Sequence, residues 1–391
     1  MSAVTVPERV DVCVVGGGVI GLAVAFELAE RGRRVAVLEA GEAGHRAAAW
    51  VAAGMIAPVS EADIAHPELT RLALESHRLY PGWVERIEAV TGLNTSFDQA
   101  GTLWVAVHRD HSGRLEHLRA FQVERGLNTV RLSATDVRER EPLLAPNASG
   151  GLLARDDWQV NPRRLLHALA AAVTAHQGVV VESAPVTDIE RHGSGWRVSA
   201  SIEGDHATSV EAAQVVLAPG ARGGALLERW LPGAGMRAVK GQVLRLRAPE
   251  GEPIAHHVIR TPEVYLVPRA DGEVVVGATM EEMGFDERVT VWAVHDLLRE
   301  ARRVLPGIAE LDFVEGRAGF RPALRDHLPA IGAVEEGLFV ATGHFRSGIE
   351  LAPATGRLIA DLVVDGHTDD LVQPFDPGRF AAAAVGKQAP A

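Results

Sequence analysis

The pattern of apolar and polar residues predicts a strand, a helix and a second strand near the start of the chain. Residues 10–15 and 34–39 are short, largely apolar runs, which is typical of strands buried on both faces. Residues 19–31 between them are apolar with few interruptions and predict a helix. The order strand, helix, strand indicates a parallel βαβ-type unit.

Predicted helices and strands continue to alternate as far as residue 220. Asn161 and Pro162 mark one helix start, because asparagine caps a helix N-terminus and proline suits the first turn. Helices are predicted at residues 68–90, 115–124, 133–141 and 161–175. Strands are predicted at residues 102–107, 178–182, 185–190, 195–201 and 214–218. This alternation favours further parallel βαβ units.

The pattern changes after residue 236. Turn residues such as Asp271 and Gly272 separate closely spaced strands, which indicates an antiparallel sheet. These strands are predicted at residues 240–247, 256–260, 263–268 and 273–277, and a helix follows at 291–305. A strand at 338–341 then leads into a glycine-containing turn and a final helix through about residue 364. This second strand–glycine–helix unit predicts that the chain returns to the first module.

We therefore predict an α/β protein in which an antiparallel-sheet domain is inserted into a Rossmann-like domain. At 391 residues the chain is long enough for two domains with separate cores. The Rossmann-like, cofactor-binding domain is predicted to comprise residues 1–80, 146–235 and 325–391. The inserted domain, which is to hold the substrate, is predicted to comprise residues 81–145 and 236–324.

Composition narrows the range of partners. The net charge of −12 argues against nucleic acids and anionic membranes, because both bind basic surfaces. No segment has the roughly 18 uninterrupted apolar residues of a membrane span, and the first ten residues lack a signal-peptide pattern. Cys13 is the one cysteine, so no intrachain disulfide forms and we expect a cytoplasmic location. No metal-ligand spacing occurs, so we expect no metal.

The glycines after the first strand predict a site for an adenine dinucleotide. Gly16 permits the tight turn, Gly18 lets the backbone approach a pyrophosphate, and Gly21 lets the helix pack closely. The positive N-terminus of the helix faces the phosphates, and Glu39 ends the second strand as an acceptor for a ribose 2′-hydroxyl. The competing interpretation is a glycine-rich turn without a ligand. The loop alone does not separate FAD from NAD.

Six separated motifs resemble the D-amino-acid-oxidase-type flavoproteins, and among these the glycine oxidases of thiazole biosynthesis. The motifs cover nearly the whole chain in order. They are GGGVIG at residues 16–21, AAGMIAP at 52–58, VYLVPR at 264–269, VGATM at 276–280, AGFRP at 318–322 and GHFRSGIELAPATG at 343–356.

The resemblance implies an FAD-dependent oxidase of small amino acids such as glycine or sarcosine. A hydride passes from the substrate Cα to flavin N5 to give an imine, and O₂ is reduced to H₂O₂. Because the single cysteine lies in the first strand, FAD is expected to be bound noncovalently. The resemblance also implies a role in thiamine biosynthesis and a homo-oligomer.

The resemblance assigns site residues by position. Arg321 is expected to clamp the substrate carboxylate with two parallel hydrogen bonds, Tyr265 to donate a further one, and Met280 to line the pocket. Arg346 completes this catalytic set, either as a charge at the flavin or as an ion-pair residue. The expected cofactor-binding residues are Gly16, Gly18, Val19, Ile20, Gly21, Glu39, Ala48, Ala49, Ala52, Gly54, Met55, Val186, Gly220, Gly343, Arg346, Gly348 and Ile349.

Two departures from the family pattern concern the expected site. Ala48 and Ala49 stand where relatives often carry hydroxyl residues, so phosphate contacts are expected from backbone amides or from Arg46. Glu263 stands where some relatives have a histidine, which leaves the polar edge of the pocket and the substrate preference open.

Three other functions fit the same residues. A D-amino-acid or N-methyl-amino-acid dehydrogenase or demethylase of the same fold would pass electrons to an acceptor other than O₂, and comparing H₂O₂ release with dye reduction separates it. A nonenzymatic flavin-binding protein is excluded if anaerobic glycine bleaches the flavin. An NAD enzyme would carry no flavin on purification.

Overall fold

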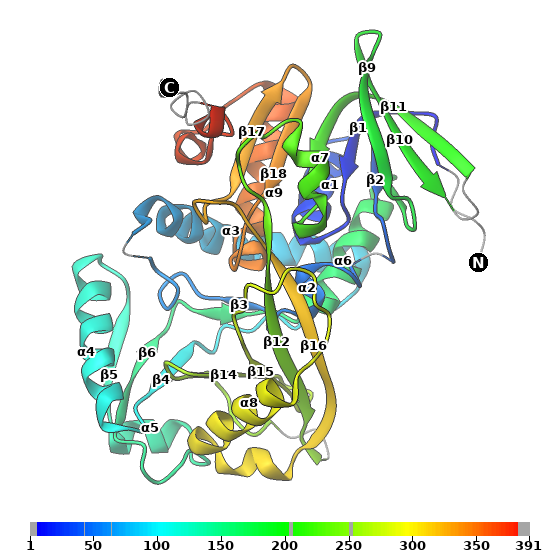
Figure 1. Cartoon of the computed structure of the whole chain (residues 1–391). Helices are drawn as coiled ribbons and strands as arrows, with labels where there is room; N and C mark the ends of the chain where they lie inside the picture. The colour runs from blue at the N-terminus through cyan, green and yellow to red at the C-terminus, as the bar shows by residue number, and fades with distance from the viewer. Residues whose placement is uncertain (1–5, 43, 64, 203–205, 250–252, 382–391) are drawn as a thin grey trace, which may run out of the picture.

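The first predicted unit is present in the computed structural model, which describes residues 6–42, 44–63, 65–202, 206–249 and 253–381 (Figure 1). Its elements are β1 (Arg9–Val15), α1 (Val19–Glu30) and β2 (Val35–Leu38), within one or two residues of the predicted bounds. β1 pairs in parallel with β2 on one side and with β11 (His206–Leu217) on the other. Buried on both faces, β1 forms the centre of the first sheet.

The first sheet has eight strands. Its order is β17–β18–β11–β1–β2–β8, and β10 and β9 continue from β11 as an antiparallel extension. The strands not yet given are β8 (Val179–Val181), β9 (Val186–His192), β10 (Gly195–Ile202), β17 (Ala330–Glu335) and β18 (Leu338–Thr342). β8 and β18 pair in parallel with β2 and β11, whereas β17 pairs antiparallel with β18. The parallel centre is the Rossmann-like part of the fold.

Helices cover one face of this sheet. They are α1, α3 (Pro67–Thr91), α6 (Pro162–Ala175) and α9 (Gly348–Asp365). α1 packs against α6 and α9, and α3 packs on the same two helices, so all four contribute to one apolar core. A smaller core on the other face includes β9, β10 and α7 (Gly224–Glu228). No helix within the described ranges is long and apolar enough to cross a bilayer.

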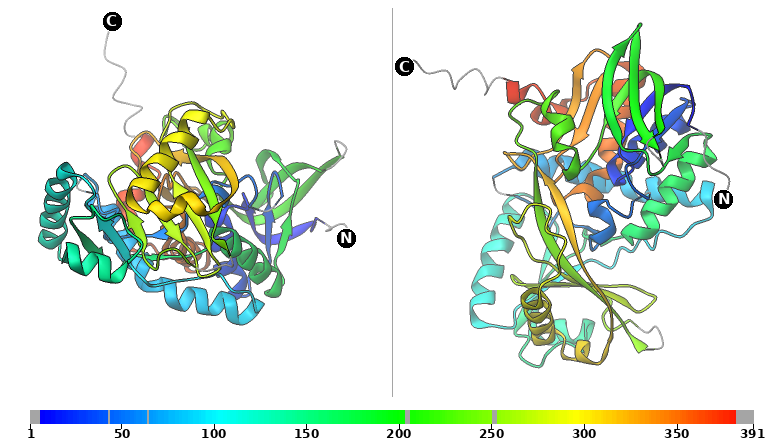
Figure 2. Two further views of the ribbon diagram at one scale, coloured as in Figure 1. Left: turned by 90° about the horizontal axis from the view of Figure 1, so that it is seen from below. Right: turned by 45° about the vertical axis from the view of Figure 1, so that its right-hand side comes forward.

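The second sheet also has eight strands, in the order β16–β12–β15–β14–β13–β4–β6–β5. Neighbouring strands are antiparallel except for the parallel pair β13 and β4. The strands are β4 (Thr102–Val105), β5 (Thr129–Ser133), β6 (Gly150–Ala154), β12 (Arg237–Arg247), β13 (Val258–Arg260), β14 (Tyr265–Pro268), β15 (Glu273–Gly277) and β16 (Asp312–Ala323). β12 and β16 run side by side in the second sheet, and their Arg237 and Ala323 ends lie toward the first sheet (Figures 1 and 2).

The remaining helices, two-residue strands and 3₁₀ turns lie outside the two eight-stranded sheets. They are α2 (Ala48–Val51), β3 (Met55–Ile56), α4 (Arg109–Glu124), α5 (Ala134–Arg140), β7 (Trp158–Gln159), α8 (Val291–Val304) and the 3₁₀ turns η1 (Ala221–Gly223), η3 (Pro306–Glu310) and η4 (Asp370–Phe375). Two predicted helix starts are confirmed. Ser133 and Asp136 form a reciprocal capping box on α5, and the Asn161 side chain accepts hydrogen bonds from the first amides of α6.

Parts of the predicted organisation are wrong. The alternation between residues 102 and 154 does not produce parallel units, because β4, β5 and β6 belong to the second sheet. β6 also lies within residues 146–235, the range predicted for the first domain. The start of β6 has glycine where a strand pattern would show an apolar residue. Glycine is needed there because a Cβ on Gly151 would lie 2.3 Å from the Trp104 carbonyl oxygen.

The predicted boundary at residue 80 falls inside α3. This helix continues past Pro81, because Tyr80, Trp83 and Ile87 are buried in the same core as α1 and α9. β17 has no predicted counterpart. The remaining domain boundaries stay predictions, and their outer ends at residues 1–5 and 382–391 lie outside the described residues.

Candidate functional site

A cavity of about 960 Å³ opens where the carboxyl ends of the parallel strands meet the second sheet. Its walls include residues that directly follow β1, β2, β11 and β18, and residues of β12, β14, β15 and β16. In open α/β sheets ligands bind at the carboxyl ends of the strands. The topology therefore brings both glycine-containing turns, after β1 and after β18, to one cavity.

The turn after β1 has the geometry expected of a phosphate site. Gly16 has a φ of 108°, and a Cβ on it would lie 2.3 Å from the Ala218 carbonyl oxygen. A Cβ on Gly21 would lie 1.9 Å from the Gly16 carbonyl oxygen, so Gly21 lets α1 begin directly against the turn. Gly18 caps α1 without a side-chain hydrogen bond, and the first turn of α1 has no acidic residue. The N-terminal amides of α1 therefore suit an anion.

Glu39 is held at the wall of the cavity by two backbone amides. Its Oε2 accepts from Gly17 N–H at 2.7 Å and its Oε1 from Gly41 N–H at 3.0 Å. A carboxylate keeps further lone pairs for a ligand hydroxyl. The Ala184 amide donates to the Glu39 carbonyl oxygen, which brings Val186 to the same end of the cavity. This end suits a ribose and an adenine.

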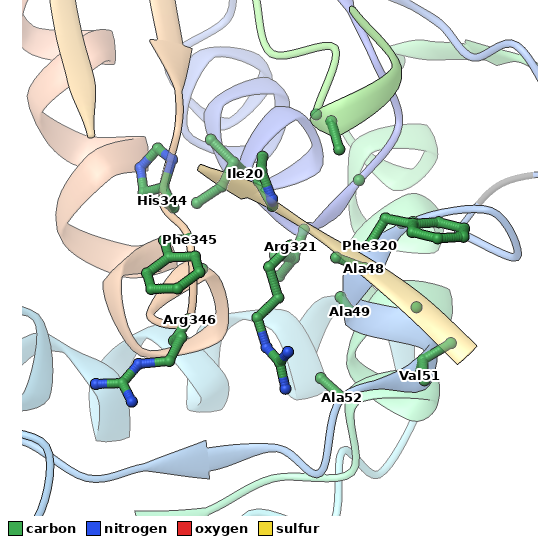
Figure 3. Close-up of a pocket in the computed structure, with 18 of the residues that line it drawn as sticks. Ile20, Ala48, Ala49, Val51, Ala52, Phe320, Arg321, His344, Phe345 and Arg346 are labelled. Carbon is green, nitrogen blue, oxygen red and sulfur yellow. The ribbon is translucent and has the colours of Figure 1, made fainter. Parts of the chain in front are cut away.

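A segment of small residues lines the next part of the cavity. A Cβ on Gly54, whose φ is 88°, would lie 2.0 Å from the Val160 carbonyl oxygen, so glycine is required there. Ala48, Ala49 and Ala52 have small side chains that leave the backbone open toward the cavity. Arg46, just before them in the chain, adds a positively charged side chain to the same wall. Figure 3 shows Ala49 and Ala52 beside the Arg321 side chain.

Arg321, on β16, enters the cavity with part of its guanidinium already anchored. Nη1 donates to the carbonyl oxygens of Lys240 at 3.3 Å and Thr279 at 3.2 Å. A Cβ on Gly241 would lie 2.4 Å from Nη1, so glycine provides the space for the guanidinium. Burial lowers the pKa of Arg321, but a guanidinium stays charged at neutral pH. The Nε and Nη2 donors remain for a ligand.

Tyr265, on β14, lies on the same cavity wall. Its hydroxyl and ring pack over Gly277, where a Cβ would lie 2.4 Å from the hydroxyl oxygen. Burial raises the pKa of Tyr265, partly offset by the positive charge of Arg321. The hydroxyl is therefore protonated at neutral pH and can donate a hydrogen bond.

Arg346 forms an ion pair rather than standing free. Its Nη2 lies 3.0 Å from Glu61 Oε2, and Arg260 pairs with the same carboxylate. Burial opposes the ionisation of Glu61, but Arg260 and Arg346 outweigh it and hold the pKa of Glu61 below its ordinary value. Within the described part of the chain, no carboxylate lies within 4.0 Å of the Arg321 guanidinium. Of these three arginines, Arg321 is the one left to a ligand.

The two remaining pocket positions lie at the rim. Met280 lines the cavity but is 64% exposed. Glu263 is also exposed at the rim, where it contacts His111 at 3.1 Å and Arg114 at 3.4 Å. The position that differs from some relatives thus carries a carboxylate that has two basic neighbours.

The structure brings the predicted site residues together, since every one of them except Gly21 lines this cavity. Sequence reasoning missed Glu61, Gly241, Gly277 and Glu350, which line it as well. Glycine inside a strand often marks a close approach, which is the signal that Gly241 and Gly277 carry. Glu350 interrupts an otherwise apolar helix start, and Glu61 follows a small-residue segment.

The lining fits a flavin dinucleotide better than a smaller ligand. It combines a carboxylate for a ribose, an uncapped helix N-terminus for phosphates and small residues against which a planar ring can lie. Cys13 is buried within β1, so it does not face a cofactor. The described residues contain no group of three histidine, cysteine or acidic side chains that could hold a metal ion.

Comparisons with known proteins agree with this lining. A family model described as FAD dependent oxidoreductase matches residues 11–362. The chain is 36% identical over 376 residues to a glycine oxidase of Geobacillus kaustophilus, covering 95% of this chain and 97% of that protein. A crystal structure of glycine oxidase from the same organism has a TM-score of 0.87 at 34% identity, covering 95% of this chain and 99% of that one.

A second type of relative is longer. The chain is 35% identical over 385 residues to a protein named bifunctional protein ThiO/ThiG in Trichormus variabilis, covering 96% of this chain. The chain spans 56% of that protein, which is about half of its length.

Proposed function

Because the chain belongs to the FAD dependent oxidoreductase family and uses FAD as its cofactor, we propose that it is an oxidase of glycine, sarcosine and similar small amino acids, with O₂ as the electron acceptor. The observation that carries this proposal is Arg321, whose guanidinium is anchored on one side, charged, and open to the cavity on the other. Such a group binds a carboxylate in one orientation. We infer that the substrate also carries an amine, because the relatives are named glycine oxidase.

Arg321 orients the substrate. A carboxylate on Nε and Nη2 is fixed in position and in angle, because the other nitrogen is held by two carbonyl oxygens. Tyr265 donates a further hydrogen bond to the carboxylate from the same wall. Glu61 pairs with both Arg260 and Arg346, so these two guanidinium groups already have a partner, whereas that of Arg321 has no carboxylate partner among the described residues. Orientation of the Cα–H bond is the main contribution of these groups to the rate.

The cofactor contacts follow from the rest of the lining. We propose that Glu39 and Val186 hold the adenosine end, Gly16 and Gly18 the pyrophosphate, and Gly348 the flavin end. When bound, FAD supplies the acceptor for the hydride of the substrate Cα–N oxidation. The first turn of α9 adds backbone amides and a positive helix end to that part of the cavity.

The test is anaerobic mixing of purified holoprotein with glycine, sarcosine and larger D-amino acids. We expect glycine and sarcosine to bleach the visible flavin band, and readmitted O₂ to restore it with one H₂O₂ per imine formed. If a dye but not O₂ restores the band, the protein is a dehydrogenase of the same fold. If none of these compounds bleaches the band, the proposed function is wrong.

A further inference from the structure

Glu350 is a carboxyl group in the cavity wall that the proposed chemistry does not use. It lies in the first turn of α9 and is 5% exposed. Its Oε1 accepts a hydrogen bond from Ala57 N–H at 3.1 Å. Among the described residues, no lysine, arginine or histidine lies within ion-pair distance of it, whereas Glu61 nearby has two arginines. A buried carboxyl without a cation is uncommon, because burial disfavours its charged form.

Local structure fixes the part of the backbone that carries this side chain. Pro353 removes one helical amide from α9, and the freed carbonyl oxygen of Ile349 accepts a hydrogen bond from the Tyr80 hydroxyl at 3.1 Å. The Ser76 hydroxyl donates to the Glu350 carbonyl oxygen at 2.6 Å and accepts from the next amide of the helix. The backbone at Glu350 is therefore tied to α3 at two consecutive carbonyls.

The groups around Glu350 are mostly acidic or neutral. Facing it are Glu61 from the turn after β3, Asp157 from the turn before β7, Tyr80 from α3 and Ser347 from the loop before α9, and His344 of the same loop contacts Thr355 of α9. His344 is neutral, since burial lowers its pKa to about 3. Burial first, and then the charges of Glu61 and Asp157, raise the pKa of Glu350 to about 8. Glu350 is thus uncharged at neutral pH.

We propose that the Glu350 carboxyl is a redox-linked proton site of the cofactor pocket, which binds its proton more tightly when the cofactor is reduced. The proposal rests on the proposed position of the flavin at the start of α9. Reduction by a hydride adds one negative charge to the pocket. In a buried site of low dielectric, that charge disfavours the ionised form of a neighbouring carboxyl that has no cation of its own.

The proton balance of the proposed reaction is consistent with this role. Zwitterionic glycine becomes its iminium form by losing one hydride and one proton. The hydride goes to the cofactor. Where Glu350 is ionised, its carboxylate takes up the proton, and where Glu350 is already protonated, the proton leaves to solvent.

The test is the flavin midpoint potential of the holoprotein between about pH 6 and pH 10, measured with chemical reductants and mediators. One proton per two electrons lowers a potential by about 30 mV per pH unit, and two protons by about 59 mV. In wild type we expect the midpoint potential to fall by about 30 mV per pH unit up to about pH 8, and by about 59 mV per pH unit above it. Glu350→Gln, which keeps an acceptor for the Ala57 amide, should retain the shallow slope throughout.

Asp157→Asn is the matched control. Asp157 is a second buried carboxyl beside the same turn, where it accepts from the amides of Val59 and Ser60, but it does not line the cavity. This variant should keep the steep segment and start it at lower pH, because one neighbouring negative charge is gone. A single shallow slope in wild type, or a steep segment that persists in Glu350→Gln, would overturn the proposal. The potential is measured without glycine, so this test can fail while the proposed function holds, and the reverse is also possible.

Discussion

Replacing Arg321 by leucine tests the proposed substrate clamp. The change removes the charge and all donors, whereas the cavity around the adenosine end is untouched. It also leaves the carbonyl oxygens of Lys240 and Thr279 without their guanidinium donor. Arg321→Lys is therefore made in parallel, because lysine keeps the charge and one anchoring contact but loses the planar fork.

The structure sets the size of the expected effect. Nε and Nη2 are the two donors that remain for a carboxylate once Nη1 is bound to two carbonyl oxygens. Hydrogen bonds to charged groups contribute about 1.5–3 kcal/mol each, so losing two of them costs about 3–6 kcal/mol. Glycine affinity should fall by roughly 150- to 20,000-fold in Arg321→Leu, and less in Arg321→Lys.

The assay is anaerobic titration of the flavin band with glycine, together with the dissociation constant of FAD from the apoprotein. FAD affinity should stay within about twofold, because the adenosine end holds most of its contacts. Arg317→Leu is the control, since Arg317 is on the same strand, is half exposed, pairs with Glu315 and does not line the cavity. Unchanged glycine affinity in Arg321→Leu would refute the clamp.

Three further predictions concern two residues of the cavity wall and the buried carboxyl Asp157. Gly241→Ala places a Cβ against the Arg321 guanidinium and should weaken glycine binding about 10- to 100-fold with FAD retained, as measured by the same titration. Glu39→Ala removes the acceptor of the Gly17 amide and of the ribose, and should weaken FAD about 10- to 100-fold in fluorescence titration of the apoprotein. Burial raises the pKa of Asp157 to about 6, so its stabilising effect is full below the unfolded pKa near 3.8 and is lost as pH rises through 6. Urea unfolding of Asp157→Asn should therefore lack a decline of about 3 kcal/mol that wild type shows across this range.

Each of these predictions has an outcome that contradicts it. Gly82→Ala is the control for Gly241→Ala, because a Cβ on Gly82 meets nothing within 4 Å, and equal losses in both variants would exclude a local effect. If Glu39→Ala weakens glycine binding in FAD-saturated protein, Glu39 does not act on the cofactor alone. If Asp157→Asn and wild type lose stability in parallel as pH rises, Asp157 is not the titrating group.

Much of the fold was predictable because its elements carry local signals. The βαβ unit around Gly16 combines a buried strand, glycines at defined positions and an acid after the second strand. The caps at Ser133 and Asn161 are equally local. β6 was not predictable, because its pairing depends on a close approach of Gly151 to the Trp104 carbonyl group, which is distant in the sequence, and β17 was missed because Gly332 interrupts its short apolar run. The predicted division of α3 failed because Pro81 does not end a helix whose next turns are buried.

The residues of the site also fall into those that could be predicted from the sequence and those that could not. Residues on motifs, such as Arg321 and Tyr265, could be assigned from the sequence, and the structure places them in one cavity. The ion pair of Arg346 could not, because its partner Glu61 is 285 positions away in the sequence and the contact depends on how two loops meet. Glu350 was invisible for the same reason, since its surroundings come from α3 and from the turns that carry Ala57 and Asp157.

The most direct test of the central claim is a single anaerobic mixing of the FAD-loaded protein with glycine, followed by admission of O₂. The account predicts that the visible flavin band is lost, that O₂ restores it, and that H₂O₂ appears in amounts equal to the imine or its hydrolysis product. A flavin band that stays unchanged with glycine, sarcosine and larger D-amino acids would contradict it.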